Sequence, residues 1–193
     1  FWSGAAMTMV GTSAPASGGE HLLSHTLDMV SAASGGRHDL HGRQVGLGTI
    51  FSAALYEIIL SAENLAPTAC LPERIDPDYW KQAQVIASVE GHYERKKPFF
   101  RQAAEALGQP GKRAALYERL RARMKTPSQI KQWLQQAGAA HTAEAIGFGR
   151  ESLLQAALHM HEMRSRFTVV DLAWLLGILP DAAESIIDQY MIQ

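Results

Sequence analysis

Three histidines near the start of the chain have the types and spacing that could do chemistry. His21 and His25 are four residues apart, so on a helix their side chains share one face. His41 begins a second predicted helix, which a helical hairpin would bring back beside His21. Imidazole nitrogens bind zinc, nickel and iron, and a carboxylate commonly completes such a site. The spacing permits a metal site of two histidines and one carboxylate, but polar histidines that only contact neighbouring helices would have the same spacing.

Glycines flank the histidines, and they predict close approaches to the backbone. Free backbone N–H groups at a helix start form a natural seat for phosphate. Such a start is predicted directly before His21, in the turn made of Ser17, Gly18 and Gly19. The second helix has three glycines within seven residues, which are Gly42, Gly46 and Gly48. Because glycine inside a helix costs about 1 kcal/mol relative to alanine, they predict that a neighbouring backbone or a ligand comes close there.

The elements that carry these residues are predicted to be helices. Apolar residues recur at spacings of three and four, and strict alternation of apolar and polar residues is absent. A capping box is predicted between Ser17 and Glu20. The predicted helices cover residues 1–9, 17–33, 41–63, 77–88, 98–108, 111–125, a stretch from 127 onward, 151–163, 168–176 and 181–190. The sequence therefore predicts one all-α domain of about ten helices, without the Gly-x-Gly-x-x-Gly or P-loop pattern of a nucleotide site.

Composition sets limits on the partners and the location of the chain. The 193 residues are 47% hydrophobic and carry a net charge of −1, so no overall field attracts nucleic acid or an anionic membrane. The apolar runs are too short for a spanning helix, and no signal peptide is recognised. A single cysteine, Cys70, excludes an internal disulfide and indicates a reducing compartment. We therefore expect a cytoplasmic protein. The absence of an initiator Met indicates the middle of a longer polypeptide, although trimming during processing would look the same.

The stretch from Thr12 to Thr49 resembles a known metal-binding core. It contains Pro-Ala-Ser-Gly-Gly-Glu-His-Leu-Leu-Ser-His and, sixteen residues after the second histidine, His-Gly-Arg-Gln-Val-Gly. These motifs resemble those of the dehydroquinate synthase-like and iron-containing alcohol dehydrogenase superfamily, and the Pro-Ala-Ser-Gly form is typical of its sn-glycerol-1-phosphate dehydrogenase branch. The segments 137–139, 145–147 and 164–172 resemble the C-terminal end of the same branch.

The resemblance implies that residues 1–193 form the multi-helix, metal- and substrate-binding C-terminal domain of such an enzyme, without the N-terminal α/β nucleotide-binding domain. His21 and His41 match the two histidine ligands of a divalent metal, with zinc as the first choice and nickel or iron as alternatives. The third ligand would be an Asp of the preceding domain. His25 matches a histidine near the substrate, where it would position or relay a hydroxyl proton.

By the same resemblance, the enzyme would interconvert dihydroxyacetone phosphate and sn-glycerol 1-phosphate, a reaction of phospholipid metabolism. NAD or NADP would bind through the missing domain, so the isolated chain would be inactive and its own cofactor-binding residues are unknown. The expected partner is a small phosphorylated substrate, with no nucleic acid and no membrane, and a homo-oligomer remains open.

Two departures from the family pattern keep an alternative open. Arg43 stands where the motif usually has Glu, and Ala14 stands where a basic residue is common. The alternative is a non-catalytic helical module for binding or oligomerisation. Other histidines have milder interpretations: we expect His38 at the surface, and His159 and His161 on a solvated or interface helix face rather than in a substrate cleft.

Overall fold

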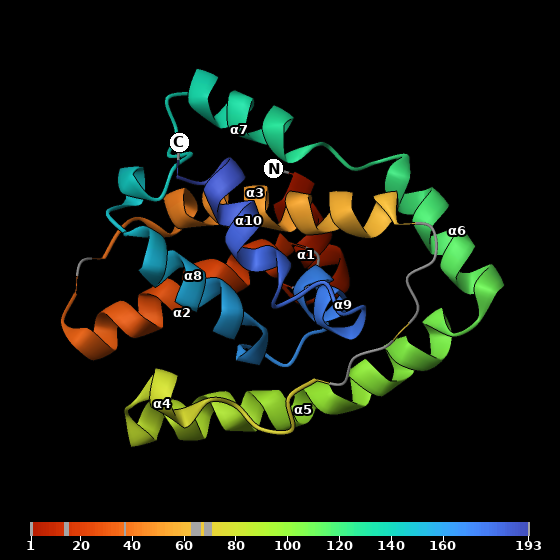
Figure 1. Ribbon diagram of the computed structural model, residues 1–193, viewed down its shortest axis with the longest axis horizontal. Coiled ribbons are helices and arrows are strands. Elements are labelled where there is room, and N and C mark those ends of the chain that lie inside the picture. Colours follow the sequence, from red (N-terminus) through yellow and green to blue (C-terminus); the bar gives the residue numbers. More distant parts are fainter. Residues whose placement is uncertain (1, 14–15, 37, 63–66, 68–70, 193) are drawn as a thin grey trace.

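A computed structural model describes residues 2–13, 16–36, 38–62, 67 and 71–192, and these residues form helices and loops without strands. Phe1, Ala14 and Cys70 lie outside the described residues. The prediction of an all-α domain is confirmed (Figure 1). The α-helices are α1 (Trp2–Val10), α2 (Gly19–Ser34), α3 (His41–Ser61), α4 (Pro77–Trp80), α5 (Ala83–Leu107), α6 (Pro110–Arg121), α7 (Pro127–Gln136), α8 (Arg150–His159), α9 (Val169–Leu175) and α10 (Ala182–Tyr190). Two 3₁₀ turns, η2 (Glu144–Ile146) and η3 (Met160–Glu162), flank α8.

The structure departs from the predicted helices in two places that matter for the site. The helix predicted over 77–88 is interrupted at Lys81, whose φ of 59° is left-handed, and α5 then continues through Pro98. The predicted capping box is wrong in its cap residue. Gly18 is the N-cap of α2, and it has no side chain to accept a hydrogen bond from the N–H groups of the first turn. Glu20 does reach back, because its carboxylate accepts a hydrogen bond from the Gly18 N–H at 2.8 Å.

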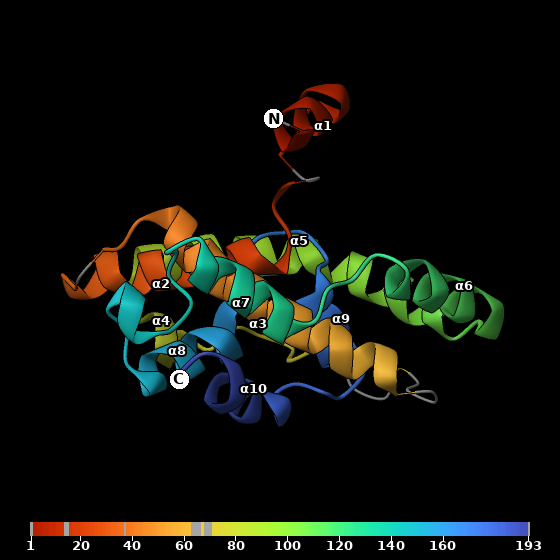
Figure 2. The ribbon, with the colours of Figure 1, turned by 90° about the horizontal axis from the view of Figure 1, so that it is seen from above.

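Helix α3 forms the centre of the core. Its apolar residues Leu47, Ile50, Phe51, Leu55 and Ile59 are fully buried. Helices α2, α7, α9 and α10 all contact it, while α1 stands apart from the body (Figure 2). Among the described helices, α3 is the one that is long and apolar enough to cross a membrane, but most of it is buried inside the fold. Its hydrophobicity is therefore that of a core helix.

The closest approach between helices occurs where α2 crosses α3 at Gly48. A Cβ atom built on Gly48 would overlap the Glu20 carbonyl oxygen and lie 2.9 Å from the Glu20 Cα. A Cβ on Gly46 would meet the Ala140 carbonyl oxygen at 3.4 Å, whereas one on Gly42 would meet nothing within 4 Å. The predicted close approach of a neighbouring backbone is thus confirmed at Gly48, and no backbone of the described residues comes as close to Gly42. Gly48 lets the backbone that carries His21 lie against α3.

A buried ion pair joins α5 to α9. The Lys96 ammonium and the Asp171 carboxylate are both fully buried and lie 3.0 Å apart. Lys96 also donates hydrogen bonds to the carbonyl oxygens of His161 and Met163, the latter at 3.0 Å. The other Asp171 oxygen accepts the Thr168 N–H at 2.7 Å and so closes the capping box of α9. This network fixes the backbone on both sides of residues 164–167.

Replacing Gly48 by alanine tests the helix crossing. We expect Gly48→Ala to lower the free energy of unfolding by about 3 kcal/mol, because the added methyl group must push the Glu20 backbone away. Gly42→Ala is the matched control in the same helix, and it should be neutral or slightly stabilising. Urea denaturation measures both, and equal effects of the two substitutions would contradict the close crossing.

Breaking the buried ion pair should be costly. Lys96→Met leaves the Asp171 charge buried without its partner, so we expect a loss of about 3–5 kcal/mol in the free energy of unfolding. The double variant Lys96→Met/Asp171→Asn removes the orphaned charge and keeps an acceptor for Thr168, so it should be more stable than Lys96→Met alone. Denaturation of the two single variants and the double variant gives the coupling energy. Additive losses would mean that the two charges do not interact.

Candidate functional site

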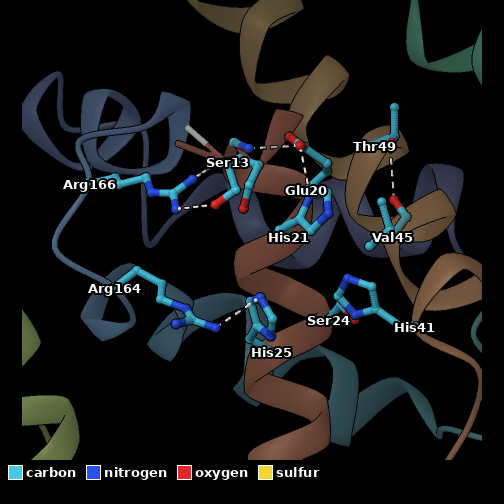
Figure 3. A network of polar contacts seen from close by, with 12 residues as sticks. Ser13, Glu20, His21, Ser24, His25, His41, Val45, Thr49, Arg164 and Arg166 are labelled. Atoms are coloured by element: carbon cyan, nitrogen blue, oxygen red, sulfur yellow. Dashed lines mark hydrogen bonds and ion pairs between the residues drawn. The ribbon is translucent and has the colours of Figure 1, made fainter. Parts of the chain in front are cut away.

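The three predicted histidines converge at the crossing of α2 and α3 (Figure 3). The ring centroids of His21 and His41 lie 5.1 Å apart, and those of His25 and His41 lie 5.2 Å apart. The two histidines of α2, His21 and His25, are 6.2 Å apart. The convergence arises because α2 presents both rings on one face, and the first residue of α3 lies opposite them. The structure therefore brings together all three histidines that the sequence analysis selected.

Two of these histidines are held by hydrogen bonds at their Nδ1 atoms. His21 Nδ1 lies 2.9 Å from the Glu20 carboxylate, which can only accept, so His21 donates. His41 Nδ1 lies 2.7 Å from Ser24 Oγ, and that hydroxyl donates to Gln44 Oε1 at 2.7 Å. Ser24 must therefore accept from His41. With the proton on Nδ1, each ring keeps an unprotonated Nε2, which is the arrangement that orients histidine for binding a metal.

Glu20 is suited to this role because it stays ionised. Burial alone would raise the pKa of its carboxyl group, but the hydrogen bonds from the Gly18 N–H and from His21 outweigh burial and hold that pKa below its ordinary value. A negative charge also lies favourably at the N-terminus of α2. The Glu20 carboxylate thus accepts hydrogen bonds both from the backbone at the start of α2 and from the His21 ring.

His25 has a different environment. Its Nε2 lies 3.2 Å from the Arg164 guanidinium, which can only donate, so this ring nitrogen is the acceptor (Figure 3). Burial first, and then the charge of Arg164, lower the pKa of His25 to about 4. His25 is therefore neutral near pH 7 and is turned toward Arg164, unlike the two histidines whose Nε2 atoms are free.

A second grouping of possible metal ligands overlaps the first. His25, Asp28 and His41 offer ligand atoms that all lie within 4.8 Å of one another. His41 Nδ1 is 3.9 Å from Asp28 and much closer to Ser24, so its Nδ1 is already committed. Asp28 also lies 3.3 Å from the exposed His38 ring. The hydrogen bonds therefore favour His21 and His41 as metal ligands, whereas the short distances between ligand atoms favour His25, Asp28 and His41.

The predicted phosphate seat is partly occupied by the protein itself. The Gly18 N–H already donates to Glu20, and the Ser17 carbonyl oxygen accepts from Arg166 at 3.0 Å. Arg166 donates a second hydrogen bond to Ser13 Oγ at 3.0 Å. Ser17, Gly18, Gly19 and Arg166 line a cavity of about 340 Å³ beside the histidines. The role of this turn in binding phosphate stays a prediction.

His161 differs from its sequence interpretation, and the structure gives contacts for two other residues that the sequence analysis named. His161, expected on a solvated or interface face, is buried with its ring 4.5 Å from that of Trp174. His159 stacks on Tyr79 with ring centroids 4.0 Å apart. The Arg43 guanidinium forms an ion pair with the Asp39 carboxylate, four residues earlier in the chain, at 2.9 Å.

Sequence reasoning missed the residues that support the histidines. Ser24 and Gln44 are fully buried polar residues, and nothing in their spacing distinguishes them from surface residues. Arg166 reaches a turn 149 residues earlier in the chain. Arg164 lies in the segment 164–172 that resembles the C-terminal end of the family branch, but the sequence predicts no role for it. Its left-handed φ of 59° carries no sequence signal, because arginine is not a residue that favours this conformation.

Comparison with known proteins identifies relatives over part of the chain. The chain is 41% identical over 91 residues to glycerol-1-phosphate dehydrogenase [NAD(P)+] of Korarchaeum cryptofilum. The match covers 44% of this chain and 29% of that protein. The same named protein of Pyrococcus horikoshii is 43% identical over 91 residues, covering 44% of this chain and 25% of that protein. That of Staphylothermus marinus is 52% identical over 54 residues, covering 28% of this chain and 14% of that protein.

These relatives confirm the resemblance to the glycerol-1-phosphate dehydrogenase family over the matched part of the chain. The chain spans less than a third of the length of each of the three relatives. No protein-family model matches the chain, and no solved structure matches it.

The protonation of the ring nitrogens is a direct test of the site. We expect His21 and His41 to carry their protons on Nδ1, and Ser24→Ala to release His41 toward the Nε2-protonated form that free imidazole prefers. Long-range proton–nitrogen correlation spectra of metal-free protein near pH 8 distinguish the two forms. The ring of His141, whose Nδ1 lies 3.0 Å from the Ala139 carbonyl oxygen, should not change and serves as the internal control. A proton on Nε2 of His41 in the unsubstituted chain would mean that Ser24 donates to the ring.

Proposed function

We propose that this chain, which is homologous over part of its length to glycerol-1-phosphate dehydrogenases, is the helical metal- and substrate-binding part of such an enzyme. The reaction would interconvert dihydroxyacetone phosphate and sn-glycerol 1-phosphate. One observation carries the proposal: His21 and His41 come from two helices locked at Gly48, and each has a fixed Nδ1 partner and a free Nε2. The names of the relatives support a dehydrogenase, and the substrate and metal are our proposals.

His21 and His41 would hold a divalent metal. Zinc, nickel and iron all accept imidazole nitrogen, and zinc is the first choice. When bound, such an ion polarises the oxygen at the carbon that gains or loses hydride. Two histidines leave room for a carboxylate and for substrate, and the resemblance implies that the carboxylate is an Asp outside this chain. The donor set therefore fits a metal site.

The protein's own groups would orient the substrate. His25 lies across from His41, with ring centroids 5.2 Å apart, so it can hydrogen-bond to a substrate hydroxyl that faces the two ligand rings. Glu20 and Ser24 would keep the ligand rings in place as that hydroxyl binds. Holding the hydroxyl in one orientation reduces the entropy that must be lost in the reaction. Because His25 Nε2 accepts from Arg164, the neutral ring carries its proton on Nδ1, and His25 is proposed to position the hydroxyl by donating that N–H to its oxygen.

The nicotinamide cofactor would be bound by residues outside this chain. The printed names of the relatives include NAD(P)+, and these proteins are more than three times longer than the segments they share with this chain. We therefore expect no turnover by the isolated chain. A cytoplasmic location, a homo-oligomeric state and the absence of nucleic-acid or membrane partners are part of the same proposal.

Zinc titration of the isolated chain tests the proposed ligands without relying on activity. His21→Ala and His41→Ala should each weaken zinc binding at least a hundredfold, measured in competition with a chromophoric chelator. Glu20→Gln should weaken it by about 10- to 100-fold, because loss of the partner that orients a ligand has an effect of this size. His141→Ala, which removes a histidine outside the cluster, should bind zinc as tightly as the parent chain.

The remaining outcomes separate the alternatives. If Asp28→Asn abolishes zinc binding while His21→Ala does not, the ion is held by His25, Asp28 and His41, and the proposed ligand pair is wrong. If neither substitution has an effect and the parent chain binds zinc no better than the triple variant His21→Ala/His25→Ala/His41→Ala, the chain is the non-catalytic helical module.

A further inference from the structure

We propose that Arg164 binds the anionic group of the substrate, in a pocket that it shares with His25 and His92. The pocket has a volume of about 420 Å³ and lies between α2, α5 and the turn after η3. This inference rests on the proposed function, because it names the part of the site that would receive the phosphate group. It differs from the seat at Ser17–Gly19 that the sequence predicts.

The backbone of Arg164 is held in an unfavourable conformation. Its φ of 59° is left-handed, and among the described residues only one other non-glycine residue, Lys81, shares this feature. A long side chain is disfavoured in that region, so the surrounding structure must enforce it. Lys96 holds the backbone on the N-terminal side of Arg164, because it donates hydrogen bonds to the carbonyl oxygens of His161 and Met163. Backbone strain that is enforced in this way is concentrated at ligand sites.

The guanidinium group of Arg164 has donors left for a ligand. Its hydrogen bond in the described part of the chain goes to His25 Nε2, a neutral acceptor, and no carboxylate of the described residues forms an ion pair with it. Arg166, two residues on, already donates to two oxygen atoms near the start of α2. Arg150 shows the contrasting case, since it pairs with two carboxylates. Arg164 thus keeps guanidinium donors that have no carboxylate partner among the described residues, and a guanidinium matches two phosphate oxygens at once.

The walls of the pocket suit a small phosphorylated molecule. His92 on α5 faces Arg164 closely enough that the charge of Arg164, after burial and Arg95, contributes to lowering the His92 pKa. Asp28 also lines the pocket, and its carboxylate lies toward His38 at 3.3 Å and His41 at 3.9 Å. An anion would therefore bind to the Arg164 guanidinium rather than beside the Asp28 carboxylate. A molecule bound there could extend past His25 toward the other two histidines.

Phosphate titrations of the zinc-loaded chain test this assignment. We would measure the binding of inorganic phosphate, sn-glycerol 1-phosphate and glycerol by calorimetry. Arg164→Asn should weaken the binding of both phosphates more than tenfold and leave glycerol binding unchanged, and Arg164→Lys should retain part of the affinity. Arg119→Asn, an arginine on the exposed face of α6, is the matched control and should bind phosphate like the parent chain.

Stability distinguishes a binding role from a structural one. Asparagine adopts the left-handed conformation more readily than arginine, so Arg164→Asn should keep or raise the urea midpoint of unfolding while phosphate affinity falls. A lower midpoint together with lost affinity would mean that Arg164 holds the fold, and the proposal would be overturned. Phosphate binding that survives Arg164→Asn but not Arg166→Gln would overturn it in favour of the Ser17–Gly19 seat. Absence of phosphate binding by the parent chain would also overturn it.

Zinc and phosphate are measured separately, so the two proposals can fail separately. If zinc binds through His21 and His41 but phosphate binding ignores Arg164, the proposed function stands and this inference is wrong. If phosphate binding in the absence of zinc depends on Arg164 but no zinc binds, the metal site is wrong and Arg164 remains an anion-binding residue.

Discussion

The Lys96 ammonium group is fully buried where α5, α9 and η3 meet, and a charge in that position must be matched by nearby oxygen atoms. Asp171 supplies the opposite charge, and two backbone carbonyl groups supply the remaining acceptors. Both carbonyls belong to the segment that leads into Arg164. Since each of these acceptors would be costly to remove, the turn that places Arg164 beside His25 is fixed by the need to satisfy one buried charge.

The second constraint is steric and acts from the other side of the histidine cluster. The absence of a side chain at Gly48 lets the Glu20 backbone lie against α3, and Glu20 immediately precedes His21. The separation between His21 and His41 is therefore set by contact between two backbones rather than by flexible side chains. A metal site needs ligand atoms placed within a few tenths of an ångström. A backbone crossing is well suited to provide that accuracy.

The sequence predicts the local parts of this arrangement better than the distant ones. His21 and His25 share a face because helical periodicity is a local property, and the all-α fold follows from the same periodicity. Lys81 and Arg164 have left-handed backbone conformations where the helix is interrupted or the chain turns. Neither residue is a glycine, so the sequence does not predict these positions. The sequence does not distinguish Lys96 from a surface lysine, because its partner Asp171 lies 75 residues away in the chain. Such positions become special only through tertiary contacts, which periodicity and spacing do not encode.

Glu20 lies at the His21 end of the cluster and Arg164 lies at the His25 end, and this asymmetry bears on how a substrate would lie in it. Glu20 holds a negative charge beside His21, at the helix end where the sequence predicts phosphate. A phosphate group there would displace the carboxylate or be repelled by it, and displacement would free the His21 ring. The positive charge of Arg164 lies beside His25 instead. For the phosphorylated substrate that we propose, electrostatics would favour one orientation, with the anionic end at Arg164 and the neutral hydroxyl end toward His21 and His41.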